Sequence, residues 1–229
     1  VTVNVVKLEE IVKIRGQRQR LRIPTYPADE LDRLVEYSVT LDTLPTDNPT
    51  ERLRNLRDKA LLLVLADSGL RVHEAVGLNR ENIDPRTMET IITGKGSKDR
   101  YIRFSNRAMA ALQAYFAARA ELDGGTGRPL RMLPAFARHD RGAGKQVKRI
   151  TTRTAENIVK ERSFEAVGNA DTSIHPHLLR HRFVTAVTDL TGDMEVAREL
   201  AGHTNVSTTA RYRHGQREKA RVVYDQLGK

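Results

Sequence analysis

The feature that most restricts the fold is a run of apolar residues at helical spacing in the first third of the chain. Its members stand at i, i+3, i+7, i+10 and i+11, and they are Leu53, Leu56, Ala60, Leu63 and Val64. This spacing places all five side chains on one face of an α-helix. The Asp67-Ser68-Gly69 segment that follows predicts where this helix ends. The sequence therefore predicts a long helix that packs one apolar face against a core.

Most of the remaining chain is also predicted to be helical. A helix begins at Ala28-Asp29-Glu30, with acids in its first turn, and a short helix covers residues 71–78. Further helices are predicted after Ser105 as N-cap, over 106–122, 152–167, 176–190, 193–201, 205–212 and 216–227. Residues 90–93 and 101–104 instead have the composition of strands and flank a polar, cationic turn, which predicts a β-hairpin.

The chain carries an excess of positive charge. Of its 229 residues, 39 are Lys or Arg and 29 are Asp or Glu, which gives a formal net charge of +10. This balance favours a polyanionic partner, either nucleic acid or an anionic membrane. A membrane is the weaker interpretation, because no apolar run approaches the roughly 18 to 20 residues of a membrane span and the cations do not gather on one amphipathic helix. The lack of cysteine excludes disulfides and thiolate metal sites.

The positive charge is concentrated in residues 128–162, which contain ten Lys or Arg residues and three acids. Part of this stretch belongs to a predicted loop over residues 123–150, and loops of that length are usually functional or mobile. One interpretation is an ordinary solvated surface. The excess of cations favours the other, which is contact with a DNA backbone.

Three separated segments carry residues suited to phosphate chemistry. In Ser68 to Glu74 a glycine ends one helix and Arg71 begins the next. The Gly94-Lys95-Gly96 turn is not a Walker phosphate loop, because Glu89 stands where that motif requires glycine. In His177-Leu178-Leu179-Arg180 the histidine and the arginine are at i and i+3, so their side chains share a helix face.

A fourth segment pairs His203 with Tyr212, nine residues later and among cations. A phenol with a pKa near ~10 is a poor nucleophile at neutral pH, and nearby positive charge lowers that pKa. The same cations would hold an anionic substrate such as a phosphodiester. A metal site built from His175, His177, His181 and His203 is the alternative. It is disfavoured because acids are scarce nearby and the arginines would repel a cation.

Taken together, these segments resemble the catalytic domain of the tyrosine recombinases, the phage integrase family. The family pattern is S/T-G-L-R-x-x-E, then a G-K-G-x-K-x-R hairpin, H-x-L-R-H, L-G-H, and a tyrosine nine residues after that histidine. This chain has Ser68 to Glu74, Gly94 to Arg100, His177 to His181, Ala201-Gly202-His203 and Tyr212, in that order. It departs from the pattern in Ala201, which replaces the usual leucine, and in the long basic loop.

The resemblance implies an α+β fold that is mainly α-helical, with a small antiparallel three-stranded sheet over about 82–104 at one edge. It implies that residues 24–229 are the catalytic domain. Residues 1–23 would then be a linker or the remnant of a missing N-terminal DNA-binding domain. Because the chain starts at Val1 rather than Met, we expect a fragment of a longer protein.

The resemblance also implies a role for each chemical residue. Arg71 and Arg180 would clamp the non-bridging oxygens of the scissile phosphate, since the planar guanidinium donates in pairs and stays charged. Tyr212 would attack phosphorus and form a 3′-phosphotyrosyl link, and Lys95 would protonate the leaving 5′ oxygen. His177 would serve as a base or hydrogen-bond donor, and His203 as a further phosphate donor. No cofactor, metal or ATP is implied.

Other residues are expected to support this chemistry. Glu74 would orient an arginine or a helix. The candidates for contact with the DNA backbone are Lys98, Arg100, Arg141, Lys145, Lys148, Arg149, Arg153 and Arg211. The expected partner is double-stranded DNA in the cytoplasm, at the nucleoid, with no membrane. The full-length protein is expected to form a tetrameric synapse, in which the apolar C-terminal tail docks on a neighbouring protomer or packs in cis.

Two alternative functions remain open from the sequence. A type IB topoisomerase shares the fold and chemistry but reseals the same strand; the hairpin, H-x-L-R-H and Gly-His sequences favour the recombinase. A catalytically silent DNA-binding regulator is disfavoured because every chemical position is filled.

Overall fold

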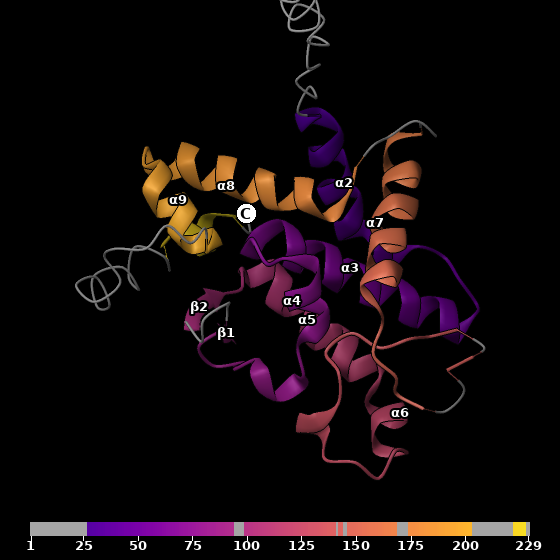
Figure 1. Ribbon diagram of the computed structural model, residues 1–229. Helices are drawn as coiled ribbons and strands as arrows, with labels where there is room; N and C mark the ends of the chain where they lie inside the picture. The colour runs from indigo at the N-terminus through magenta and orange to yellow at the C-terminus, as the bar shows by residue number, and fades with distance from the viewer. Residues whose placement is uncertain are drawn as a thin grey trace, which may run out of the picture.

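The computed structural model describes residues 27–93, 99–140, 142–143, 146–168, 174–202 and 222–227. The helices are α2 (Ala28–Thr40), α3 (Pro49–Ser68), α4 (Val72–Gly77), α5 (Asn106–Ala118), α6 (Ala120–Gly124), α7 (Thr152–Val167), α8 (Pro176–Thr191) and α9 (Met194–Ala201). Short 3₁₀ helices lie at Leu41–Thr43, Arg80–Asn82 and Leu130–Met132, and residues 222–227 are helical. In Figure 1, α8 and α9 lie at one end of the molecule and α6 at the other.

The central element is α3, and its sequence explains both of its ends. The side chain of Asn48 accepts hydrogen bonds from the backbone N–H groups of Thr50 and Glu51, and Pro49 occupies the first turn. Gly69 ends the helix with φ of 64°, in the left-handed region that glycine adopts without strain. The helix packs against α2, α5, α7 and α8.

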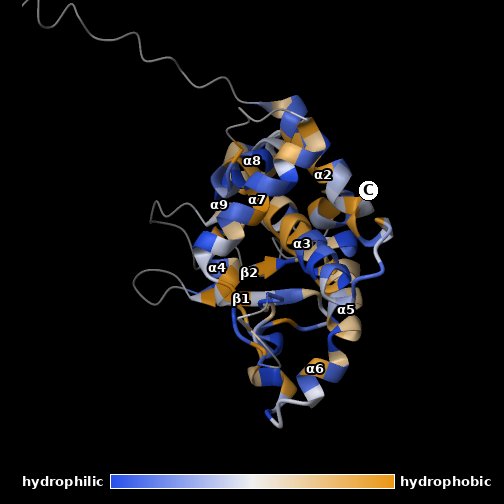
Figure 2. Cartoon of the chain, turned by 90° about the vertical axis from the view of Figure 1, so that its right-hand side faces the viewer, coloured by the Kyte–Doolittle hydropathy of each residue, from blue (hydrophilic) through white to orange (hydrophobic). Residues whose placement is uncertain are grey.

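The prediction of a one-faced amphipathic helix was wrong for the second half of α3. Every residue from Ala60 to Leu70 is buried, because helices cover α3 on several sides. Figure 2 shows α3 in the middle of the molecule, with hydrophobic residues along only part of its length. A surface helix has one apolar stripe, whereas a helix that is apolar all round is buried. Among the described residues, no helix has the length and apolar character needed to cross a membrane.

The predicted hairpin is present as strands β1 (Glu89–Thr93) and β2 (Asp99–Arg103), paired antiparallel with Ile92 opposite Arg100. The mainly α-helical fold class is confirmed. The expected third strand is not present in the described part of 82–104, where residues Arg80–Asn82 form a 3₁₀ helix and Asp84 only bridges to Glu89.

The helix predicted over 106–122 begins as expected, with Ser105 accepting a hydrogen bond from the N–H of Ala108, but it divides at Arg119 into α5 and α6. The predicted helices over 152–167, 176–190 and 193–201 appear as α7, α8 and α9. The helix predicted over 205–212 and the start of the one over 216–227 lie outside the described residues.

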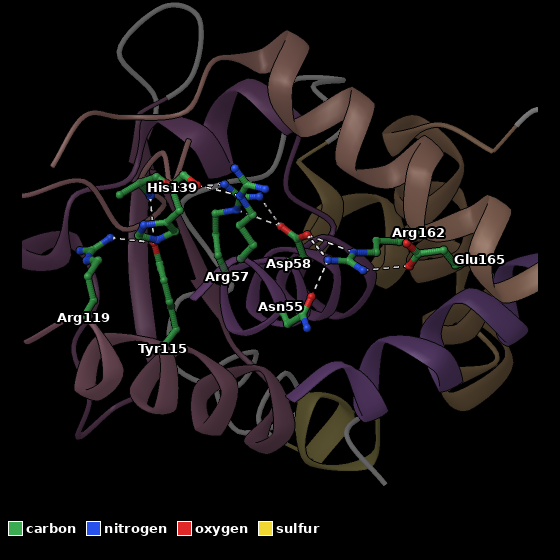
Figure 3. Close-up of polar contacts among 10 residues, drawn as sticks. Asn55, Arg57, Asp58, Tyr115, Arg119, His139, Arg162 and Glu165 are labelled. Atoms are coloured by element: carbon green, nitrogen blue, oxygen red, sulfur yellow. Dashed lines mark hydrogen bonds and ion pairs between the residues drawn. The ribbon is translucent and has the colours of Figure 1, made fainter. Parts of the chain in front are cut away.

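A network of buried polar side chains holds the helices around α3 and α5 together (Figure 3). Arg119 is fully buried and donates to Asp123, to the hydroxyl of Tyr115 and to two backbone carbonyls. Farther along, Asp58 of α3 binds both Arg57 and Arg162, which joins α3 to α7. These guanidinium groups have their charge balanced within the fold, which is what a buried cation requires.

Candidate active site

The end of α3 and the start of α4 place Arg71 beside α8. An alanine Cβ at Gly69 would lie 2.5 Å from a ring carbon of Phe183, so the glycine allows the turn to approach α8 closely. Arg71 is the N-cap residue of α4, and its backbone N–H donates to Glu74 Oε2 at 2.7 Å. The Arg71 guanidinium donates to the other oxygen, Oε1, at 3.1 Å, while the side chain remains 39% exposed. Glu74 thereby holds the backbone and one guanidinium nitrogen of Arg71, while the rest of the guanidinium is accessible to a ligand.

Arg180, on the first turns of α8, is the most unusual cation of the site. Only 2% of its surface is exposed. Its Nη1 donates to the backbone carbonyl of Gly69, but its buried Nη2 has no hydrogen-bond partner within the described ranges. Burial, together with the positive charges of Arg71 and Arg100, lowers the pKa of Arg180 to about 10. The guanidinium is still charged at neutral pH, and no carboxylate hydrogen-bonds to it among the described residues.

Arg71 and Arg180 line one cavity of about 200 Å³ together with His73, Pro176 and His177. The i and i+3 spacing of His177 and Arg180 predicted this common face, and both side chains reach the cavity. A space of this size, bounded by two guanidinium groups, suits a tetrahedral oxyanion such as a phosphate.

His177 stands in a group of imidazoles at the start of α8. Its ring is stacked with that of His175 at 6.3 Å and meets the ring of His181 edge-on at 4.6 Å. Partial burial lowers the pKa of His177, and the neighbouring His181, His175, Arg180 and Arg71 lower it further. His177 is therefore neutral at pH 7 and able to accept a proton. In the described ranges, no group of three or more His, Cys, Asp or Glu side chains is arranged to hold a metal ion.

Four of the candidate residues for DNA-backbone contact are described, namely Arg100, Lys148, Arg149 and Arg153. Two of them are exposed, and the other two form hydrogen bonds within the fold. The side chain of Arg153 is 81% exposed and Lys148 is also exposed, so both are open to a partner. Arg149 instead donates to the carbonyls of Val76 and Leu78 and to Asn79, so its guanidinium is used within the fold. These acceptors, at and just after the end of α4, take up three hydrogen bonds from Arg149, and its expected contact with DNA stays a prediction.

Arg100 was also expected to contact DNA or solvent, and the structure gives it a different partner. Both of its terminal nitrogens donate to Glu74, at 3.0 and 2.7 Å. The sequence shows Arg100 only as a cation on a hairpin, so its pairing with a residue 26 positions earlier was not predictable from local pattern. Lys95, Lys98, Arg141, Lys145, His203, Arg211 and Tyr212 lie outside the described residues.

Comparison with known proteins identifies relatives along nearly the whole chain. The model of the phage integrase family matches residues 27–219. The tyrosine recombinase XerC of Xanthomonas axonopodis pv. citri is 32% identical over 213 residues, covering 93% of this chain and 61% of the relative. XerC of Lacticaseibacillus casei is 34% identical over 208 residues, covering 90% of this chain and 62% of the relative. The chain thus spans about three fifths of the length of these curated relatives.

Solved structures show the same fold. The crystal structure of XerA recombinase superposes with a TM-score of 0.60 at 22% identity, covering 91% of this chain and 60% of the other. The integrase from mycobacterium phage Brujita gives a TM-score of 0.58 at 22% identity, covering 89% and 57%. With the family match over most of its length, the chain belongs to the phage integrase family, whose XerC relatives are tyrosine recombinases.

Proposed function

We propose that this chain is the catalytic domain of a site-specific DNA recombinase that cleaves and rejoins DNA through Tyr212. The observation that carries the proposal is Arg180, which lines a cavity with Arg71 and His177 and whose buried Nη2 has no hydrogen-bond partner among the described residues. A buried guanidinium nitrogen without a hydrogen-bond acceptor destabilises the fold. A ligand that brings negative charge into the cavity removes that cost, and the phosphodiester of DNA is such a ligand.

The arrangement suits phosphoryl transfer without a metal ion. Arg71 and Arg180 approach the cavity from different elements, α4 and α8, so they reach different non-bridging oxygens of one phosphate. Charge on those oxygens changes as phosphorus becomes pentacoordinate, and fixed donors that already point at them stabilise this state. His177, neutral at pH 7, is placed to accept or relay a proton beside the phosphate.

The remaining steps are assigned to residues outside the described ranges. The hydroxyl of Tyr212 loses its proton to His177 or to water, and its oxygen attacks phosphorus. The bond from this oxygen to phosphorus forms, the phosphate stays on the 3′ oxygen, and the bond from phosphorus to the 5′ oxygen breaks. Lys95 gives that oxygen a proton, and His203 donates a hydrogen bond to the phosphate. The 5′ hydroxyl of a partner strand then reverses the step and releases Tyr212, so no ATP is consumed. The order and spacing of the motifs support this assignment.

Double-stranded DNA is the proposed partner, bound by four copies of the full-length protein in the cytoplasm, at the nucleoid. A solved structure of XerH recombinase, similar in fold to this chain, is described as bound to a palindromic difH substrate.

At the C-terminal tail, Val223 and Tyr224 are buried with Phe183 and Val187 of the same chain. This packing supports the cis arrangement of the tail in the isolated chain. Docking of the tail on a neighbouring protomer is proposed only for the assembled complex on DNA.

The test uses a pool of nicked DNA duplexes of randomised sequence, incubated with the chain in EDTA. Cleavage beside a nick releases a short fragment, so the covalent intermediate is trapped. We expect adducts that survive denaturation, whose recovered sequences define a site, and that are absent with Tyr212→Phe. DNA binding without any adduct would contradict the proposal.

The recovered site then separates recombination from topoisomerase activity. Two linear duplexes carrying the site should yield recombinant products of exchanged length. Relaxation of a supercoiled plasmid with no recombinant product would assign the chain to the topoisomerase class instead.

A further inference from the structure

Strand β2 carries an arginine whose side chain faces the helical body. Arg100 is opposite Ile92 in the hairpin, and Ile92 and Ile102 are both buried. Because residues two apart on a strand share a face, Arg100 points to the same side as Ile102. Its side chain is 17% exposed and it meets Glu74, whose side chain is 8% exposed.

Glu74 is shared between two arginines, oxygen by oxygen. Oε1 accepts from Arg100 Nη1 at 3.0 Å and from Arg71 Nη1 at 3.1 Å. Oε2 accepts from Arg100 Nη2 and from the backbone N–H of Arg71, both at 2.7 Å. Burial by itself would raise the pKa of Glu74, but the hydrogen bonds from Arg100 and Arg71 lower it, so the carboxylate is ionised.

The same guanidinium also touches the end of α9. Gly202 ends that helix with φ of 72°, and a Cβ built there would lie 2.6 Å from Arg100. Arg100 therefore connects three parts of the chain: strand β2, the start of α4, which lines the cavity, and Gly202 at the end of α9.

We propose that Arg100 is a positioning residue for Arg71, a role that rests on the recombinase function proposed above. By binding both oxygens of Glu74, Arg100 takes a large share of the carboxylate charge and fixes the carboxylate in place. Glu74 then orients Arg71 through its backbone and one guanidinium nitrogen while leaving the rest of the guanidinium for phosphate. Without Arg100, Glu74 would pair with Arg71 alone and draw it away from the phosphate.

The test compares single-turnover cleavage of the recovered nicked site by Arg100→Met and by a matched variant, Arg162→Met. Arg162 binds Asp58 with side-chain exposures of 13% and 5%, close to those of Arg100 and Glu74, and neither Arg162 nor Asp58 lines the cavity. Arg100→Met should cleave about 10²-fold more slowly, since a small displacement of a catalytic group costs that much. Arg162→Met should cleave bound DNA at the rate of the unaltered chain.

Adding Glu74→Gln to Arg100→Met removes the charge that captures Arg71, so the double variant should cleave faster than Arg100→Met. A direct role of Arg100 on DNA predicts otherwise. In that case the loss would lie in DNA affinity, the salt dependence of binding would weaken, and Glu74→Gln would restore nothing. That result would overturn the proposal, as would equal cleavage by Arg100→Met and Arg162→Met.

A second measurement needs no cleavage. Titration with inorganic sulfate, followed by the ¹⁵N signals of labelled arginine side chains, reports anion binding at Arg71, whose signal is assigned with Arg71→Lys. Arg100→Lys keeps the charge but loses the fork, and it should weaken sulfate binding at Arg71. Unchanged binding in Arg100→Lys would overturn the positioning role while the recombinase function stands. Absence of both sulfate binding and DNA adducts in the unaltered chain would instead remove the proposed function, and this inference with it.

Discussion

Buried arginines occur in two regions of this protein, and their surroundings differ. Around α3 and α5, the fully buried Arg119 and the partly buried Arg162 donate to carboxylates, a hydroxyl and carbonyls, which balance their charge (Figure 3). At the cavity, Arg180 is nearly as buried as Arg119, yet its Nη2 has no hydrogen-bond partner in the described part of the chain. After burial itself, the groups that shift its pKa most are two other arginines. A buried cation whose charge the fold leaves unbalanced indicates a site for an anion, whereas a balanced one indicates structure.

The largest effect on stability is expected from Arg119→Met in the structural network. The variant leaves the buried carboxylate of Asp123 with Arg80 as its remaining cation and removes the donors to Tyr115 and two carbonyls. Breaking a buried ion pair on one side costs about 3 to 5 kcal/mol. Chemical denaturation should show a loss of that size. A loss below about 1 kcal/mol would mean that the network is not what stabilises this region.

Arg180→Met should instead lower the rate of DNA cleavage without lowering the stability of the fold. Removing a donor that stabilises transition-state charge lowers the rate by about 10²- to 10³-fold. Its removal also relieves a buried charge, so the free energy of unfolding should stay equal or rise. The two readouts are adduct formation on the nicked site and a denaturation curve. A variant that unfolds more easily and cleaves normally would place Arg180 with the structural arginines.

Gly69→Ala tests the contact that brings the two halves of the cavity together. Alanine at this position would have to keep φ of 64°, which costs about 1 to 2 kcal/mol of backbone strain. Its Cβ would also lie 2.5 Å from the ring of Phe183, which adds about 1 to 3 kcal/mol of overpacking. Gly168→Ala is the matched control, because Gly168 has φ of 72° and no atom within 4 Å of an added Cβ. The control should lose only the strain, and sulfate binding should weaken in Gly69→Ala alone. Equal losses in both variants would show that the approach to Phe183 is unimportant.

The difference between these regions also explains what the sequence could predict. Helix ends depend on local chemistry, so the sequence predicted both Ser105 as an N-cap and the end of α3 at Gly69. The family motifs marked Arg71, His177 and Arg180 as candidates. The partner of a given cation is decided by tertiary packing, however. Arg149 and Arg100 look like surface charges in the sequence, but the folded chain brings acceptors to them from residues 76–79 and 74.

The same limit applies to burial. The apolar spacing of α3 indicates one face, and the covering of its other sides depends on where α5, α7 and α8 pack. The division of the helix at Arg119 has a similar origin, because its guanidinium binds the carbonyls of Pro134 and Ala135, which belong to a distant loop. Local propensity contains no information on either arrangement.

The smallest expected effect is a pH dependence that separates the two histidine environments. His177 has a lowered pKa at the cavity, caused first by partial burial and then by His181, His175, Arg180 and Arg71. A bound anion favours its protonated form, so sulfate should bind more tightly as the pH falls below the ordinary histidine value of about 6.5. Sulfate itself does not titrate there. The increase in affinity should be under about tenfold, because one imidazolium beside a partly hydrated anion contributes less than about 1.4 kcal/mol.

Two variants assign this pH dependence to one histidine environment or the other. His177→Gln should flatten the dependence of sulfate affinity on pH. His139, in the structural network, has its pKa lowered to about 3 by burial and by Arg57, Arg119 and Arg54. It therefore stays neutral throughout the titration, and His139→Gln should leave the slope unchanged. A slope that survives in His177→Gln would show that His177 is not the source of the pH dependence.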